Sequence, residues 1–272
     1  MELLRALAAL AEPPDRAGAE QLAAALGLGP LPAPSEHTEV FVFQLAPYAS
    51  AYLGAEGMLG GEARDRVAGF WRALSQTPPA EADHLTLMLA LYARLAEFEA
   101  GEADASRREG WRRARKAFLW EHLLSWLPVY LDKLAGLAPP FYRRWGELLT
   151  KALLEEAATL GAQEELPLHL REAPALAADA SAQGAEDFLQ SLLAPARSGI
   201  ILTRADLSRA ARTLGTGARA GERKFILKAL LNQDAAGVFG WLADEAEAWT
   251  RLHHARRAAY GEVAAQIIIR GD

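Results

Sequence analysis

The chain has 272 residues, a formal net charge of −6 and an apolar content of 51%. This composition excludes a disordered protein, because enough apolar surface is present to build a sizeable core. The absence of cysteine excludes disulfides and thiolate metal sites. Val, Ile and Thr number only six, six and nine, whereas Ala, Leu, Glu and Arg are abundant, so the composition predicts an all-α protein.

Neither a secretory leader nor a membrane span is expected from the sequence. The first ten residues carry Glu2 and Arg5 within an apolar stretch, which is typical of a short amphipathic helix. Apolar runs stay shorter than the roughly 18 residues that cross a bilayer. We therefore expect a cytoplasmic protein, and its acidic balance suits a basic peptide partner better than bulk nucleic acid.

Apolar residues recur with the helical period along most of the chain, and Gly or Pro marks the breaks. Pro128 lies inside the longest pattern and should kink that helix, because it removes one donor and clashes with the preceding turn. Thr203 and Asp206 have the spacing of a capping box. Residues 267–272 show no helical period and stay unassigned. The helical segments are expected, in chain order, at 3–11, 17–26, from 36, 63–74, 84–99, 107–134, 139–160, 203–214, 221–231, and from 234 to 260 or beyond.

Three segments carry a recognisable order of motifs. Residues 78–84 read PPAEADH and open a helix, and residues 118–130 read FLWEHLLSWLPVY. Residues 47–52 read PYASAY, with Trp71 on the next long helix. An acid before Asp-His, a His-x-x-x-Trp-x-Pro helix and a Pro-Tyr-x-Ser-x-Tyr stretch together resemble the TorD/DmsD/NarJ family of molybdoenzyme maturation chaperones.

The resemblance covers residues 38–160 and implies a TorD-like helical bundle with additional C-terminal helices. It also implies a cytoplasmic chaperone and no enzyme. Such a chaperone binds the twin-arginine leader and the body of a molybdenum-cofactor oxidoreductase, and assists cofactor insertion and complex assembly before export. By the same resemblance no cofactor is bound stably, and contact with the molybdenum cofactor or a guanine nucleotide would be transient. Long helices joined by flexible loops permit a homodimer by domain swapping but do not predict one.

The resemblance also implies which residues bind the leader peptide. Paired guanidinium groups prefer carboxylate partners, and an aromatic wall would accept the apolar stretch. Each assignment has a structural alternative, since Asp83 could simply cap its helix and Trp126 could simply be core. Two positions depart from the family pattern, because Ala82 stands where proline is common and Ala49 replaces an acid. The residues assigned to leader binding are Tyr48, Ser50, Tyr52, Trp71, Glu81, Asp83, His84, His122 and Trp126.

A basic segment follows at residues 197–228, which contains eight cationic residues and only two acidic ones. A solvated helical face is the ordinary interpretation of such a run. Contact with an anionic ligand, either a cofactor or an acidic patch on the client, through Arg204, Arg209 and Arg212 is a second interpretation. The two helical patterns within the segment leave a third, a DNA- or nucleotide-binding regulator with a basic face against phosphates.

Three units are expected along the chain: a bundle at 1–165, a poorly structured connector at 166–184, and a helical extension at 185–272 that packs on the bundle. A single domain is the alternative. Metal-ligand and catalytic motifs are not recognised, since no His-Glu-x-x-His, Walker-type or dinucleotide pattern occurs. A further alternative to the chaperone is an enzyme for a small ligand that uses His84 and Asp83 as an acid/base pair.

Overall fold

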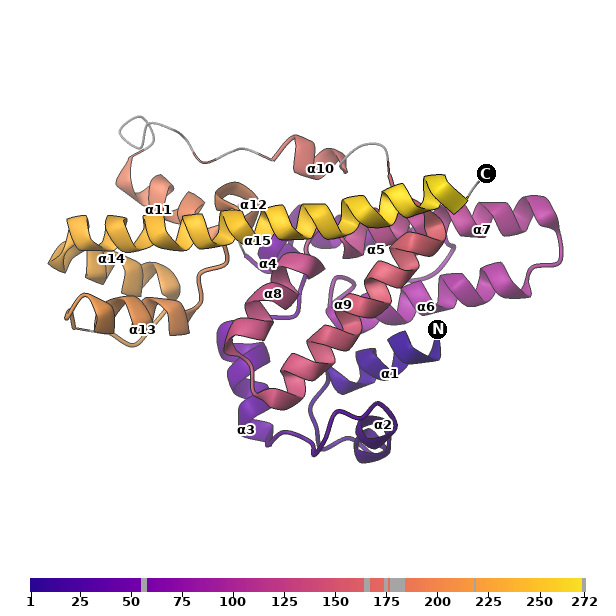
Figure 1. The fold of residues 1–272 in the computed structure, drawn as a ribbon, viewed down its shortest axis with the longest axis horizontal. Helices are drawn as coiled ribbons and strands as arrows, with labels where there is room; N and C mark the ends of the chain where they lie inside the picture. Colours follow the sequence, from indigo (N-terminus) through magenta and orange to yellow (C-terminus); the bar gives the residue numbers. More distant parts are fainter. Residues whose placement is uncertain (55–57, 164–166, 174–175, 177–183, 218, 271–272) are drawn as a thin grey trace.

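The computed structural model describes residues 1–54, 58–163, 167–173, 176, 184–217 and 219–270, and for 261–270 it describes the backbone alone. Within these residues the regular elements are all helices, apart from one isolated antiparallel bridge between Tyr48 and His84. The prediction of an all-α protein is confirmed (Figure 1). None of the described helices combines the length and the apolar character that a membrane span needs.

The first part of the chain forms a helical bundle. Its centre is α6, which packs against α1 on one side and α7 on the other, while α8 and α9 form an adjoining pair. The α9 helix ends at Gly161, whose φ of +81° favours glycine. The helices of this part are α1 (Glu2–Leu10), α2 (Ala19–Ala25), α3 (Pro34–His37), the π-helical η1 (Thr38–Gln44), α4 (Ser50–Leu53), α5 (Gly61–Ala73), α6 (Leu85–Gly101), α7 (Ala105–Phe118), the π-helical η2 (Leu119–Leu123), α8 (Leu127–Leu137) and α9 (Pro140–Leu160).

The prediction of one kinked helix at 107–134 is wrong. The chain forms α7, a wide π-helical turn in η2, and then a new helix, α8. Trp126 precedes α8 with a φ of −140°, so the helical path is interrupted before the proline is reached. Pro128 lies in the first turn of α8, where its missing N–H costs nothing, and it therefore helps to start a helix instead of bending one.

The second part of the chain adds further helices, and the longest of them, α15, lies across α9 (Figure 1). The capping box is confirmed, because Thr203 N donates to Asp206 Oδ2 at 2.7 Å while Asp206 N donates to Thr203 Oγ1 at 3.3 Å. The last helix was predicted to run to 260 or beyond, and α15 continues to Arg270, so it includes residues 267–270, which the sequence pattern left unassigned. The helices of this part are α10 (Leu168–Arg171), α11 (Ala185–Leu193), α12 (Pro195–Ser198), α13 (Arg204–Thr213), α14 (Arg223–Gln233) and α15 (Ala235–Arg270).

The predicted connector at 166–184 falls largely outside the described residues. Its described part contains α10, a short helix that the sequence pattern did not predict. Residues 166, 174–175 and 177–183 lie outside the description.

Side chains of the two parts meet in one apolar core and in ion pairs. Lys133 Nζ of α8 lies 2.6 Å from Asp206 Oδ2 of α13, and both side chains are almost fully buried. Asp132 of α8 pairs with Arg256 of α15. The division into units at 1–165 and 185–272 stays a prediction.

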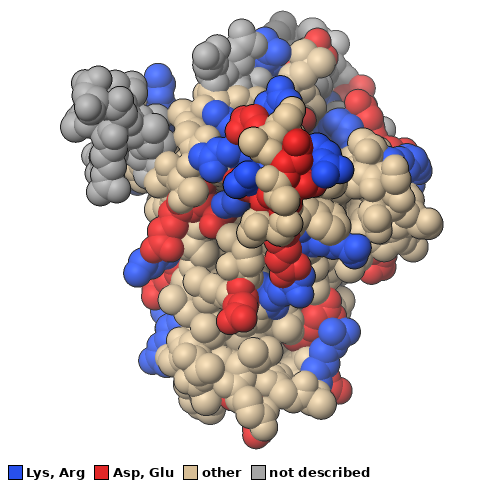
Figure 2. All heavy atoms as spheres, turned by 90° about the vertical axis from the view of Figure 1, so that its right-hand side faces the viewer, with Lys and Arg blue, Asp and Glu red and all other residues tan. Residues whose placement is uncertain are grey.

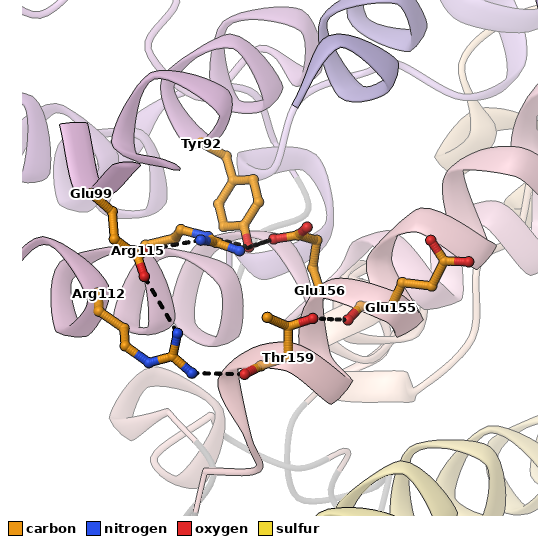
Figure 3. A network of polar contacts seen from close by, with 7 residues as sticks. All are labelled: Tyr92, Glu99, Arg112, Arg115, Glu155, Glu156 and Thr159. Carbon is orange, nitrogen blue, oxygen red and sulfur yellow. Dashed lines mark hydrogen bonds and ion pairs between the residues drawn. The ribbon is translucent and has the colours of Figure 1, made fainter. Parts of the chain in front are cut away.

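A second buried ionic network joins α6, α7 and α9 (Figure 3). The Arg115 guanidinium donates to Glu99 Oε2 at 2.7 Å, to Glu156 Oε2 at 2.5 Å and to the Tyr92 hydroxyl at 3.2 Å. Burial and the Glu156 carboxylate raise the pKa of Tyr92, so its hydroxyl stays protonated as a donor. On the face that carries the end of the α6–α7 hairpin, acidic and basic side chains are intermingled over the surface (Figure 2).

Candidate functional site

Two loops that resemble the family motifs meet in the structure. The segment before α4 and the segment before α6 form the antiparallel bridge between Tyr48 and His84. Ala49 N donates to Asp83 O at 3.0 Å, and Leu85 N donates to Pro47 O at 2.8 Å. Motifs that are separated in sequence are thereby held as one double loop, called here the 48/84 loop pair.

Asp83 supports this loop pair from within. Its carboxylate is buried, and Oδ2 accepts the Ser50 N–H at the start of α4 at 3.0 Å. Ser50 is buried as well, and its hydroxyl accepts the Gly60 N–H at 2.9 Å. Because a buried N–H without a partner is costly, the Asp83 carboxylate fixes the first turn of α4.

The structural alternative in which Asp83 caps α6 does not hold. The N-cap residue is His84, whose Nδ1 accepts the Thr86 N–H at 3.3 Å. In that role Nδ1 is the acceptor nitrogen, and the ring proton of neutral His84 lies on Nε2. Asp83 therefore bonds to α4 across the loop pair instead of to its own helix.

Carboxylates surround His84. Glu12 Oε1 lies 4.0 Å from Nδ1, and Glu81 and Asp83 act on the same ring. Burial lowers the pKa of His84 and outweighs these three acids, which act to raise it. The Tyr48 ring packs edge-on against His84 with centroids 4.8 Å apart, and burial together with the Glu81 carboxylate raises the pKa of Tyr48 to about 12.

The acids of this cluster differ in access. Glu81 is exposed, Glu12 is partly buried and paired with Arg16 at 3.1 Å, and Asp83 is buried. An arriving cation therefore meets Glu81 first. The loop pair offers an acidic surface that a guanidinium group can reach.

The predicted aromatic residues lie deeper than expected. The Tyr52 ring stacks on Trp126 with centroids 5.3 Å apart, and Trp126 is only 1% exposed. The buried His122 ring contacts Phe70 and Phe118, and burial lowers its pKa to about 4. These side chains form core packing behind the loop pair, which does not favour direct peptide contact by His122 or Trp126.

Trp71 lies apart from both groups. It lines a hollow of about 380 Å³ between α1, α5 and α6, together with Thr86 and Leu87. Its buried Nε1–H finds no hydrogen-bond acceptor among the described residues. The predicted leader-binding residues are therefore divided among the loop pair, this hollow and the core, and their role in leader binding stays a prediction.

The basic segment is likewise divided. Arg209 pairs with Asp206 and Glu245, and Lys224 and Lys228 both pair with Glu186. Arg212 is exposed, whereas Arg204 lies over the Phe43 ring at 5.9 Å. Arg204, Arg209 and Arg212 thus have different surroundings, and the segment does not present its cations as one uniform face for phosphates.

One feature of the surface was missed from the sequence. A groove of about 620 Å³ lies between the bundle and the C-terminal helices, and we call it the η1–α14 groove. Successive apolar residues 40–43 could have signalled it, because a helical segment cannot bury four neighbouring side chains on one face. Its lining includes Val42, Phe43, Gln44, Ala46, Ala51, Tyr52, Met58, Leu59, Gln190, Leu193, Pro195, Ile201, Arg204, Glu222, Arg223 and Lys224.

Comparison with known proteins agrees with the motif resemblance. Residues 8–132 match the sequence model of a family described as nitrate reductase delta subunit. The match begins ahead of the predicted start at 38 and ends before 160. The chain is also 35% identical over 97 residues to the protein named Chaperone protein TorD from Vibrio vulnificus (strain CMCP6), a stretch that is 33% of this chain and 43% of that relative. The alignment thus spans less than half the length of the curated relative. Both similarities point the same way: residues 8–132 are similar to the nitrate reductase delta subunit family, and a stretch of 97 residues is similar to a protein named as a TorD chaperone.

Proposed function

We propose that this protein is a maturation chaperone that binds the twin-arginine leader of a molybdenum-cofactor oxidoreductase before the client is exported. It performs no covalent chemistry, and cofactor insertion into the client is assisted by holding the client back. The family match over residues 8–132 supports this proposal, since the match includes both members of the 48/84 loop pair. The observation that carries it is the accessible acidic surface of that loop pair.

The chemistry of the leader fits this surface. A guanidinium group binds carboxylates through charge-assisted hydrogen bonds, and Glu81 is an exposed carboxylate for the first arginine. Glu12, whose Oε1 lies 4.0 Å from His84 Nδ1, is the second carboxylate of the cluster. Asp83 then acts by holding the loop pair in place.

An acid/base enzyme at the same position is less well supported. In a catalytic pair the carboxylate would orient the imidazole through a hydrogen bond. Here Asp83 Oδ2 accepts from Ser50, and His84 Nδ1 accepts from Thr86. Both groups are thus engaged with backbone donors, which suits a rigid binding loop better than proton transfer.

Co-purification tests the proposal. A molybdoenzyme precursor with its leader should be retained by the immobilised protein, and the same precursor without the leader should be retained less. Glu81→Gln should weaken the leader-dependent part, whereas Glu109→Gln, which removes an exposed carboxylate on α7, should not. Equal retention with and without the leader contradicts leader recognition, and retention unchanged by Glu81→Gln contradicts the role of Glu81.

A further inference from the structure

The η1–α14 groove gathers exposed apolar side chains. Val42 is 63% exposed, Phe43 48%, Met58 61% and Leu59 59%. Among the described residues these make up half of the large apolar side chains that are exposed, and all four line this one groove. Because soluble proteins seldom leave apolar side chains gathered in water, such a patch indicates a binding surface.

The groove is also cationic. Of its described lining residues, Arg204, Arg223 and Lys224 are basic and Glu222 alone is acidic. Lys224 forms an ion pair with Glu186, with 2.9 Å between Nζ and Oε1. The surplus positive charge therefore resides on the two arginines.

Both arginines lie in the groove without an anionic partner among the described residues. Arg223 is partly buried, and its Nη1 donates to the Leu202 carbonyl at 2.9 Å. Burial lowers the pKa of Arg223, and the charge of Arg204 acts in the same direction. The Arg204 guanidinium lies over the Phe43 ring, so one cation and one exposed aromatic side chain share the same wall. A carboxylate brought into the groove would offset the charge of both guanidinium groups.

The groove is held in shape by the surrounding elements. Gln44 Oε1 of η1 accepts the Ala205 N–H at the start of α13 at 3.0 Å, which joins the two walls. At the groove, the Tyr52 hydroxyl donates to the Ala46 carbonyl at 2.8 Å, and its ring stacks on the core residue Trp126. A pre-formed groove loses less conformational entropy on binding than a loop that must first be ordered.

We propose that the η1–α14 groove binds an apolar peptide segment that carries an acidic residue. The apolar part covers Val42, Phe43, Met58 and Leu59, and the carboxylate pairs with Arg204 and Arg223. A twin-arginine segment does not fit, because its charges would repel those two cations. This site is separate from the 48/84 loop pair and opposite to it in charge, so it would take a part of a partner protein other than the leader.

Fluorescence anisotropy with three labelled peptides tests the proposal. All three share one stretch of alternating Leu and Ala and end in two Asp, two Asn or two Lys. The Asp peptide should bind the wild-type protein most tightly and the Lys peptide least tightly. Arg204→Gln should weaken the Asp peptide about three- to tenfold and leave the Asn peptide unchanged. Val42→Ser should weaken both peptides.

Matched controls separate the groove from general surface effects. Arg113→Gln removes an exposed arginine from α7, and Leu252→Ser removes an exposed apolar residue from α15. Both should bind the Asp peptide as the wild type does. Arg204→Gln is preferred to Arg223→Gln, because the Arg223 side chain also supports Leu202 and its loss can affect folding.

Three results would overturn the proposal. Equal affinity of wild type for the Asp and Lys peptides would remove the charge argument. A dimer in light scattering that Val42→Ser dissociates would assign the groove to a second copy of the chain. Binding of duplex DNA that Arg204→Gln abolishes and Val42→Ser spares would assign it to phosphates. Glu81→Gln should leave the Asp peptide unaffected, so failure of leader binding and failure of this groove are distinguishable.

Discussion

Replacing Asp83 tests the architecture of the 48/84 loop pair. Asp83→Ala removes the only side-chain acceptor seen for the Ser50 N–H in the described part of the chain, and both residues are at most 2% exposed. Loss of a hydrogen bond to a charged group costs about 1.5–3 kcal/mol, and burial leaves no water to replace it. Asp83→Asn keeps an oxygen acceptor, so the loss should fall to about 0.5–1.5 kcal/mol.

Urea unfolding followed by circular dichroism measures these differences in the free energy of unfolding. Asp104→Ala is the matched control, because Asp104 is an exposed N-cap whose Oδ1 accepts the Arg107 N–H at 2.8 Å. Loss of that ordinary cap should cost about 0.5–1 kcal/mol. If Asp83→Ala costs no more than Asp104→Ala, the bond from Asp83 to α4 does not stabilise the fold as argued.

The same variants separate positioning from direct contact. If Asp83 holds the loop pair, Asp83→Asn should weaken a twin-arginine peptide and its double-glutamine version by similar factors. If it instead removes only the arginine-dependent affinity while stability is unchanged, Asp83 contacts the arginines directly and its assigned role is wrong.

Three further predictions concern the buried interior. Arg115→Met leaves the partly buried Glu156 without its cation and Glu99 with Arg112 alone, so the free energy of unfolding should fall by about 3–5 kcal/mol. A urea midpoint equal to that of wild type would contradict this. Trp126→Ala opens a cavity in the core and should cost about 3–5 kcal/mol; a loss below 1 kcal/mol would show that the site collapses freely. Burial acts to raise the pKa of Asp206, but Lys133 and Thr203 outweigh it, so the pKa is lowered. The Asp206 carboxylate therefore stabilises the fold fully above the ordinary Asp pKa of about 4, and this contribution is lost as pH falls through the lower pKa of the folded state. Asp206→Asn should flatten the loss of stability that sets in as pH falls below about 4, and an unchanged pH profile of the urea midpoint would contradict the assignment.

The helices were predictable because their signals are local. Apolar residues at the helical period, the Thr203 capping box and Gly161 all act within a few residues, and the structure contains each of them. The sequence predicted an irregularity near Pro128, but as a kink within one helix and not as the start of a new helix. Pro128 can either kink a helix or start one, and the choice depends on packing around Trp126 that no local pattern contains.

The site was harder to predict because its bonds are long-range. Asp83 and His84 are adjacent and both can accept an N–H, so sequence alone could not decide which one caps α6. Asp83 does not cap α6 because its carboxylate accepts the N–H of Ser50, which lies 33 positions away in sequence. The η1–α14 groove depends in the same way on contacts between η1 and α13, which the helical period of either segment does not encode.

Isothermal titration of a twin-arginine leader peptide and its double-glutamine version against the wild-type protein tests leader recognition most directly. The acidic surface at Glu81 predicts that the arginine peptide binds about three- to tenfold more tightly, since that carboxylate is exposed and screened by solvent. Glu81→Gln should reduce this difference, while Glu109→Gln should preserve it. Equal affinity of the wild-type protein for the two peptides would contradict arginine recognition by the loop pair.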